Sequence, residues 1–135
     1  MDLTSIELPG SRIARVRVEG DEVRVRFEPA YLIQTMTGSV ERTRWRQNIE
    51  LVFHEAELLE GADLPLPADC TGGDVIDNVY TYRDMVPVPL ESRGRAGCDL
   101  GVEGAQGRIR VEAGGVTVER EDLPKYIEHI RPEKG

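Results

Sequence analysis

Residues 15–27 read RVRVEGDEVRVRF, the clearest indication of secondary structure in the sequence. Arginine and valine alternate on both sides of a central Gly20-Asp21 pair. A period of two places the valines on one face of a strand and the arginines on the other. A leading glycine suits the first central position of a type II′ turn, which joins two antiparallel strands. The stretch therefore predicts a β-hairpin with one apolar face and one arginine-rich face.

The same two-residue period recurs along the chain and predicts further half-buried strands. It covers residues 14–18, 23–27, 45–53, 96–102, 109–111 and 116–118, and we expect additional strands near 30–36 and 79–85. The glycine-containing segment 104–107 and the pair Gly114-Gly115 are predicted as turns. Together they indicate a meander of three strands between residues 95 and 120.

Three segments depart from this pattern. Residues 60–74 combine proline and glycine with little periodicity, which is typical of a long loop. The stretch VPVPL at 86–90 has prolines at alternate positions, and since proline cannot donate to a β-ladder, we expect an edge strand or an extended segment. Residues 122–131 fit either a short helix or a strand, and their β-branched residues favour the strand.

These elements predict an all-β fold. The 135 residues are interpreted as one β-rich domain over 1–135. An antiparallel small barrel or a two-sheet sandwich of about eight or nine strands, with at most one short helix, would bring the apolar faces together in one core. Parallel βαβ units are disfavoured because no crossover helix separates the strands.

The charge of the chain limits the classes of partner that it is expected to bind. The net charge is −8; residues 1–53 hold eight basic and eight acidic residues, whereas residues 54–135 hold nine basic and seventeen acidic ones. Because phosphate contacts dominate binding to nucleic acids and anionic membranes, we expect neither as a partner. No apolar run approaches the roughly 18–20 residues of a membrane span. The acidic part is compatible with a basic protein partner, and equally with solubility alone.

The cysteines and the N-terminus predict a cytoplasmic protein. No basic segment followed by an apolar core is visible at the N-terminus, so no signal peptide is expected. Cys70 and Cys98 lack the spacing of a zinc or redox motif and are interpreted as reduced, buried thiols. Cys98 shares its parity with three apolar neighbours, which places it on the apolar face of a strand. We expect a monomer or a homodimer without a cofactor.

The register of the first hairpin creates an unusual charge arrangement. With the turn at Gly20-Asp21, Arg17 faces Arg24 and Arg15 faces Arg26. Like charges directly opposite each other destabilise a sheet, although glutamates on the diagonals can compensate. One interpretation is a solvated face patched by ion pairs. The other is a docking surface for carboxylate or phosphate, which the planar guanidinium group binds in bidentate fashion.

Two further groups of residues extend the candidate binding surface. Arg42, Arg44 and Arg46 would enlarge the arginine patch if their strand lies alongside it. Tyr80 and Tyr82 share one face near the proline-flanked edge, where tyrosines bury area while keeping a polar group for recognition. The candidate binding residues are therefore the following: Arg15, Arg17, Arg24, Arg26, Tyr80 and Tyr82.

No motif predicts a catalytic or metal-binding residue. His54 and His129 are far apart in the sequence and belong to no metal-ligand spacing. Asp69, Asp74 and Asp77 do not match the ligand spacing of a calcium loop. The serines lie outside any nucleophile motif.

The sequence alone does not determine the function. The favoured hypothesis is a non-enzymatic, cytoplasmic protein-interaction domain, such as an inhibitor or an immunity-type protein. The alternatives are a small-ligand-binding β-barrel and an enzyme whose site is assembled from scattered carboxylates and histidines. A packed interior with a surface patch would favour the first, a polar internal cavity the second, and histidine and carboxylate side chains converging in a cleft the third.

Overall fold

The computed structural model describes residues 3–130, and within them it has eleven β-strands and no α-helix. The strands are β1 (Leu3–Glu7), β2 (Arg12–Glu19), β3 (Glu22–Thr35), β4 (Arg42–His54), β5 (Glu57–Glu60), β6 (Ala68–Asp77), β7 (Tyr80–Arg83), β8 (Met85–Val88), β9 (Glu91–Val102), β10 (Arg108–Arg120) and β11 (Lys125–Ile130). The predicted all-β fold is confirmed, with more strands than expected. The part of the chain that is described includes no helix of the length and apolar character needed to traverse a membrane.

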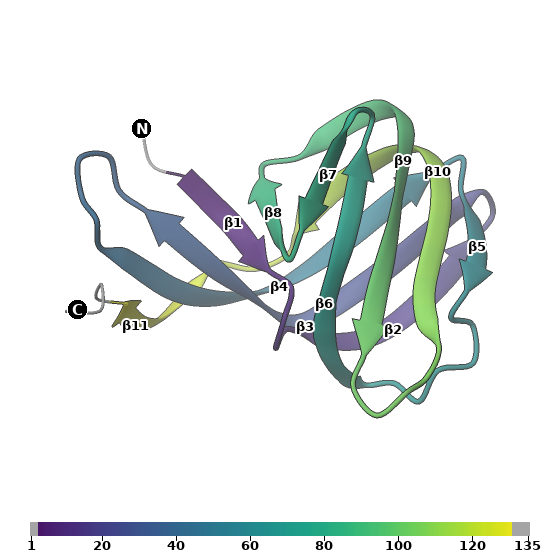
Figure 1. Cartoon of the computed structure of the whole chain (residues 1–135), viewed down its shortest axis with the longest axis horizontal. Helices are drawn as coiled ribbons and strands as arrows, with labels where there is room; N and C mark the ends of the chain where they lie inside the picture. The colour runs from purple at the N-terminus through teal and green to yellow at the C-terminus, as the bar shows by residue number, and fades with distance from the viewer. Residues whose placement is uncertain (1–2, 131–135) are drawn as a thin grey trace.

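Six of these strands close into a small barrel (Figure 1). Around it they run β4, β10, β9, β6, β2 and β3, and β3 then pairs with β4 again. All of these pairings are antiparallel. The shortest pairing in the barrel wall is between β2 and β6, which share only two residue pairs, Arg12 with Asp69 and Ile13 with Ala68. Of the two predicted architectures, the structure is therefore the barrel.

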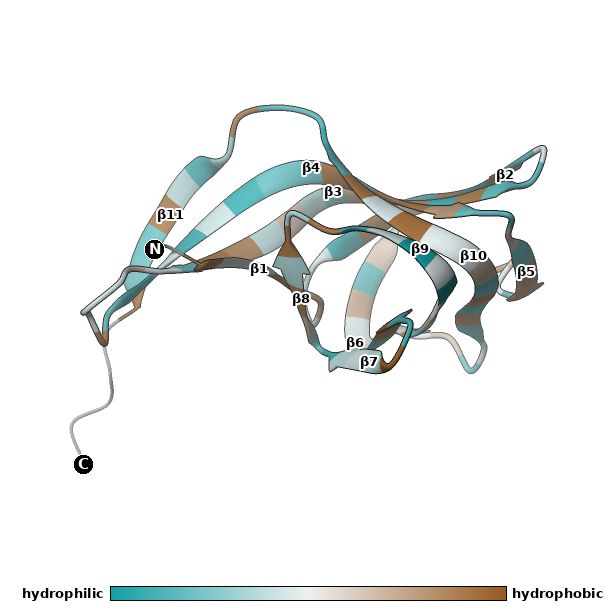
Figure 2. Ribbon diagram, turned by 90° about the horizontal axis from the view of Figure 1, so that it is seen from above, coloured by the Kyte–Doolittle hydropathy of each residue, from teal (hydrophilic) through white to brown (hydrophobic). Residues whose placement is uncertain are grey.

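Two barrel strands continue into a projecting sheet. Strands β3 and β4 are 14 and 13 residues long, and their far ends, residues 30–35 and 42–47, extend beyond the barrel. There β1 and β11 pair with them from either side, and β8 pairs with β1. We call this five-stranded sheet, β8–β1–β3–β4–β11, the arm. Seen from above, the arm is a single curved layer that leaves the barrel on one side (Figure 2).

The interior of the barrel is filled by apolar side chains. Ile49, Leu51 and Phe53, which share one face of β4, are fully buried as the two-residue period predicts, and Val52 on the opposite face is fully buried as well. Phe27 from β3 and Phe53 are the largest fully buried side chains. Ala96, Cys98, Leu100 and Val102 are all buried, so the predicted position of Cys98 on an apolar strand face is confirmed. The interior of the barrel is thus a packed hydrophobic core rather than a ligand-binding cavity.

The predicted turn at Gly114-Gly115 is wrong. Strand β10 runs through both glycines, and the register with β9 shifts between Ala113 and Gly115. Arg110 consequently lies opposite Asp99 in β9. A side chain at Gly114 would lie 2.8 Å from the carboxylate of Glu55, so this glycine serves a β-bulge that approaches another chain segment closely. The region holds two long strands instead of a three-stranded meander.

The predicted loop at residues 60–74 is also partly wrong. Strand β6 begins at Ala68, so the loop is confined to residues 61–67, and β5 precedes it. Gly72 and Gly73 have φ angles of 120° and 149° inside the strand, which explains why their sequence suggested a loop. The edge strand predicted at residues 86–90 is confirmed, because β8 lies at the end of the sheet. The strand predicted within residues 122–131 is confirmed as β11. Arg131 lies outside the described residues.

Candidate functional site

The predicted register of the first hairpin is confirmed. Arg17 pairs with Arg24 and Arg15 with Arg26, and Gly20, with a φ of 61°, opens the turn. The carboxylate of Glu50, contributed by the neighbouring strand β4, lies among these arginines. Its oxygens are 2.9 Å from Arg17, 3.4 Å from Arg26 and 3.9 Å from Arg24. One carboxylate thus bridges three guanidinium groups from two strands.

A rim of glutamates completes this arrangement. We call the whole set the arginine–glutamate network: Arg17, Arg24, Arg26, Glu50 and the rim residues Glu19, Glu22, Glu28, Glu119 and Glu121. Arg24 contacts Glu22 at 3.1 Å and Glu119 at 3.3 Å, and Arg26 contacts Glu28 and Glu121. Arg15 is exposed and forms no ion pair with the described residues. Three of the four hairpin arginines are therefore already neutralised within the chain.

The centre of the network is buried, although it lies outside the apolar core. Arg26 and Glu50 are each only 8% exposed. Burial acts to raise the pKa of Glu50, but the hydrogen bond from Arg17 and the charges of Arg17, Arg24 and Arg26 outweigh it, so the pKa lies below its usual value. An external carboxylate would have to displace Glu50 or the rim to reach these guanidinium groups. The geometry therefore favours a structural role for the network, while docking at these arginines stays a prediction.

Arg42, Arg44 and Arg46 lie on the same strand as Glu50 but at its other end, on the arm. Strand β4 does run alongside β3, as an extended patch requires. Arg44 forms ion pairs of 3.4 Å with both Glu7 and Glu128. The arm's arginines thus form a separate surface from the arginine–glutamate network.

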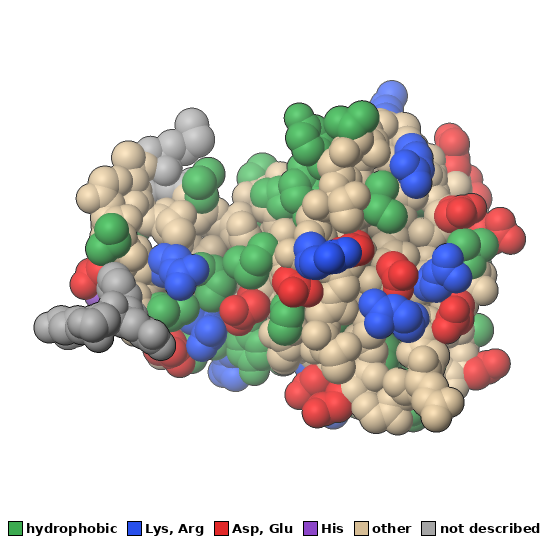
Figure 3. Space-filling view, in the orientation of Figure 1, with side chains coloured by type: hydrophobic (Ala, Val, Ile, Leu, Met, Phe, Trp, Pro, Cys, Tyr) green, Lys and Arg blue, Asp and Glu red, His purple; other side chains and the backbone are tan. Residues whose placement is uncertain are grey.

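Tyr80 and Tyr82 lie on the short edge strand β7. Their rings are stacked, with centroids 6.1 Å apart and planes inclined by 16°. Tyr80 is 61% exposed and the preceding Val79 is 89% exposed, whereas Tyr82 packs against the core. Figure 3 shows hydrophobic side chains gathered over the upper end of β7 and β8. The two tyrosines thus share one face of an edge strand, with Tyr80 exposed and Tyr82 partly buried, and their role in recognition stays a prediction.

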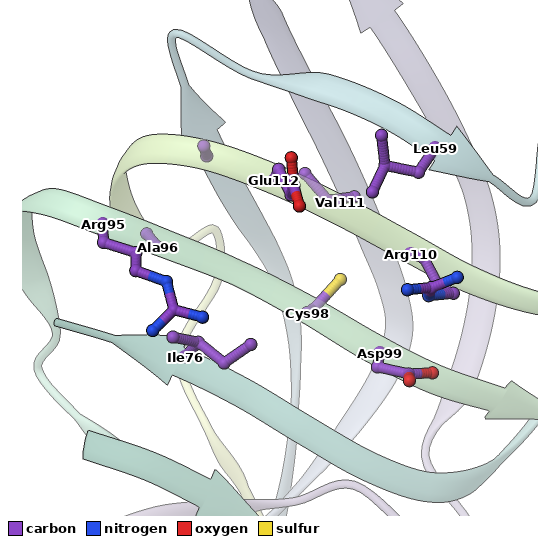
Figure 4. A pocket seen from close by; sticks show the side chains of 10 residues that line it. Leu59, Ile76, Arg95, Ala96, Cys98, Asp99, Arg110, Val111 and Glu112 are labelled. Atoms are coloured by element: carbon purple, nitrogen blue, oxygen red, sulfur yellow. The ribbon is translucent and has the colours of Figure 1, made fainter. Parts of the chain in front are cut away.

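A hollow of about 480 Å³ lies between strands β5, β6, β9 and β10. Figure 4 shows Arg95 and Arg110 toward its two ends, with Cys98 between them. Burial raises the pKa of the Cys98 thiol far above its usual value, and burial likewise raises the pKa of Cys70. Neither thiol is therefore poised to act as a nucleophile at neutral pH.

A chain of side-chain contacts that no sequence motif indicates joins three strands. The Nδ1 atom of His54 lies 3.3 Å from Glu22, and its Nε2 atom lies 2.9 Å from the Thr117 hydroxyl. His54 and Thr117 line a hollow of about 500 Å³ together with Gly114 and Gly115. No sequence spacing could indicate this chain, because its members come from β3, β4 and β10 and meet only through the strand register.

The structure and the comparisons add no assigned function. Within residues 3–130, no three His, Cys, Asp or Glu side chains are grouped so that they could hold a metal ion. No protein-family model, curated protein or solved structure matches the chain.

Proposed function

We propose that this chain is a non-enzymatic protein-interaction domain, in which the barrel is a scaffold and the arm contacts the partner. The observation that carries the proposal is the single-layered arm (Figure 2). A sheet normally buries at least one face against another layer of secondary structure. Among the described residues, the outer part of the arm has no second layer packed against it. An inhibitor or an immunity-type protein acts in this way, by covering a surface of its partner.

The distribution of exposed apolar side chains supports the arm as the contact surface. Ten large apolar side chains are exposed among the described residues, and five lie on the arm: Leu3, Met36, Val40, Tyr126 and Ile127. Met36 and Val40, at the tip between β3 and β4, are 56% and 81% exposed. The filled barrel, in turn, argues against the alternative of a ligand held inside it.

Contacts through side chains are favoured over strand addition, because the terminal strands β5, β7, β8 and β11 are protected against pairing. Strands β5 and β7 are only four residues long, and β8 contains Pro87. Strand β11 carries Lys125 and has a register shift between Tyr126 and Glu128. Short edges, prolines, lysines and bulges are the features by which proteins prevent edge-to-edge pairing.

The arm tip supplies the test. Replacing Met36 and Val40 together by aspartate should reduce capture of the native partner more than tenfold, because two apolar contacts of about 1.5–3 kcal/mol each are lost. The readout is quantitative mass spectrometry of proteins retained from the native lysate by the immobilised variant and by the unmodified chain.

The control for this experiment is Val18→Asp. Val18 is 59% exposed on β2 of the barrel, so this variant adds a charge at a comparable exposed valine outside the arm. It should retain the partner as the unmodified chain does. Contact through the arm would be refuted if the Met36/Val40 variant retained as much partner as the unmodified chain. It would also be refuted if Val18→Asp lost as much partner as the Met36/Val40 variant.

A hydrolytic activity is the second candidate, favoured by the Glu22–His54–Thr117 chain. With its Nδ1 atom facing the Glu22 carboxylate, His54 would present its Nε2 atom to the Thr117 hydroxyl as a general base. We then expect slow hydrolysis of p-nitrophenyl acetate that falls to the buffer rate in both His54→Gln and Thr117→Val, each checked for folding by circular dichroism. Hydrolysis unchanged by Thr117→Val, or absent from the unmodified chain, would remove this candidate.

A further inference from the structure

The arm has an outer face that differs in charge from the rest of this acidic chain. This face is the side of β4 that also carries Glu50, and its charged residues are Arg42, Arg44, Arg46, Lys125, Glu7 and Glu128. Both glutamates form ion pairs with Arg44. Arg42, Arg46 and Lys125 form no ion pair with any residue from 3 to 130. The face is thus locally cationic in a protein whose net charge is −8.

Arg46 and Lys125 are the most unusual part of this face. They lie directly opposite each other in the pairing of β4 with β11, where like charges destabilise a sheet. The equivalent pairs in the first hairpin are relieved by Glu50 and the rim glutamates. Arg46 and Lys125 instead border a hollow of about 290 Å³. Two carboxylates also line this hollow. Glu28 forms an ion pair with Arg26, whereas Asp122 accepts a hydrogen bond of 2.9 Å from the backbone N–H of Asn48, an uncharged donor, and forms no ion pair with Arg46 or Lys125.

A second hollow continues along the same face. It measures about 380 Å³ and is lined by Tyr31, Arg44 and Ile127 among others. Arg42 lies four residues before Arg46 on β4, a separation of about 13 Å along a strand. Between them, Arg44 carries one positive charge against the two carboxylates of Glu7 and Glu128, so this part of the face does not attract a further carboxylate.

We propose that this face binds an extended acidic segment of the protein partner, a proposal that rests on the function proposed above. One carboxylate of the segment pairs with Arg46 and Lys125, and a second, four residues away, pairs with Arg42. The residue midway between them is uncharged and packs near Tyr31 and Ile127. Charge complementarity carries the choice of partner, because an acidic side chain relieves the repulsion between Arg46 and Lys125. Recognition is through side chains and needs no addition of a strand.

The test uses a fluorescein-labelled peptide with two glutamates four residues apart and a valine midway. Fluorescence anisotropy should show binding to the unmodified chain at low ionic strength, weakening as salt is added. The double variant R46Q/K125Q should bind the peptide at least about fivefold more weakly, the effect expected from losing exposed ion pairs. The control R12Q/R83Q removes the same charge from arginines that have aspartate partners, Asp69 and Asp74, and should change the affinity less than about twofold.

Equal affinity of R46Q/K125Q and the unmodified chain, or no binding to the unmodified chain at low salt, would overturn the proposal. Dimerisation of the unmodified chain that is abolished by R46Q/K125Q in sedimentation experiments would assign the face to a second copy and would also overturn it. The capture experiment separates this inference from the proposed function. If the Met36/Val40 variant loses the partner but R46Q/K125Q retains it, the arm still contacts the partner. The proposal that the cationic face binds an acidic segment is then refuted.

Discussion

Replacing Glu50 by glutamine is expected to lower the free energy of unfolding by about 3 kcal/mol, the loss typical of a broken buried ion pair. The substitution keeps the shape of the side chain but removes the negative charge that Arg17, Arg24 and Arg26 share. Arg26 is 8% exposed, so its guanidinium group cannot compensate fully by contacting water. Urea unfolding followed by circular dichroism measures the change.

The matched control is Glu119→Gln. Glu119 contacts Arg24 from the rim, and its side chain is 51% exposed, so its loss should cost less than about 1 kcal/mol. If the two variants lose equal stability, Glu50 is no more important than a surface partner, and the structural interpretation of the arginine–glutamate network fails.

The same carboxylate also predicts a dependence on pH. Because the pKa of Glu50 is lower in the folded chain than in the unfolded one, its stabilisation is complete above the unfolded value of about 4.3. It is lost as the pH falls through the lower, folded value. In acid, the stability of Glu50→Gln should therefore decline less steeply than that of the unmodified chain.

Gly73→Ala is the second substitution with a large expected effect. Gly73 has a φ of 149°, and a Cβ atom there would lie 2.2 Å from the carbonyl oxygen of Asp99 and 2.9 Å from the Cα atom of Leu100. Both obstacles belong to the backbone of β9, so no side-chain rotation can relieve the clash. We expect the free energy of unfolding to fall by about 2–4 kcal/mol, from overpacking together with backbone strain.

Gly104→Ala separates the two causes of this loss. Gly104 also has a positive φ, 78°, but nothing lies within 4 Å of the position of its Cβ atom. Its substitution should therefore cost only the backbone strain, about 1 kcal/mol. Similar losses in both variants would mean that β6 and β9 do not approach as closely as the structure shows.

Local patterns predicted the fold well. The hairpin at residues 15–27 combines a two-residue period with a turn between its strands, and both signals lie within one short stretch. The predicted turn at Gly114-Gly115 was wrong because a pair of glycines is compatible with a turn and with a β-bulge alike. The arm could not be predicted, because nothing in the sequence shows that β3 and β4 continue beyond the barrel or that β1 and β11 pair with their ends.

The candidate sites were harder to predict than the strands. The opposition of Arg17 and Arg24 followed from the hairpin, but their compensation by Glu50 depends on the register between β3 and β4. The pairing of Arg46 with Lys125 joins residues 79 positions apart in the sequence. Such long-range registers are decided by how apolar faces meet across the whole barrel, and no short window of sequence contains that information.

Strands β3 and β4 belong to both the barrel and the arm, which has a thermodynamic consequence. The arm cannot unravel at those strands without disturbing the walls of the barrel, so the two parts are expected to melt as one cooperative unit. A molecule that attaches to the arm only in its native form would therefore protect the entire domain against heat and proteolysis. Occupancy of the arm could then be followed by a rise in melting temperature, with no need for a reporter at the interface.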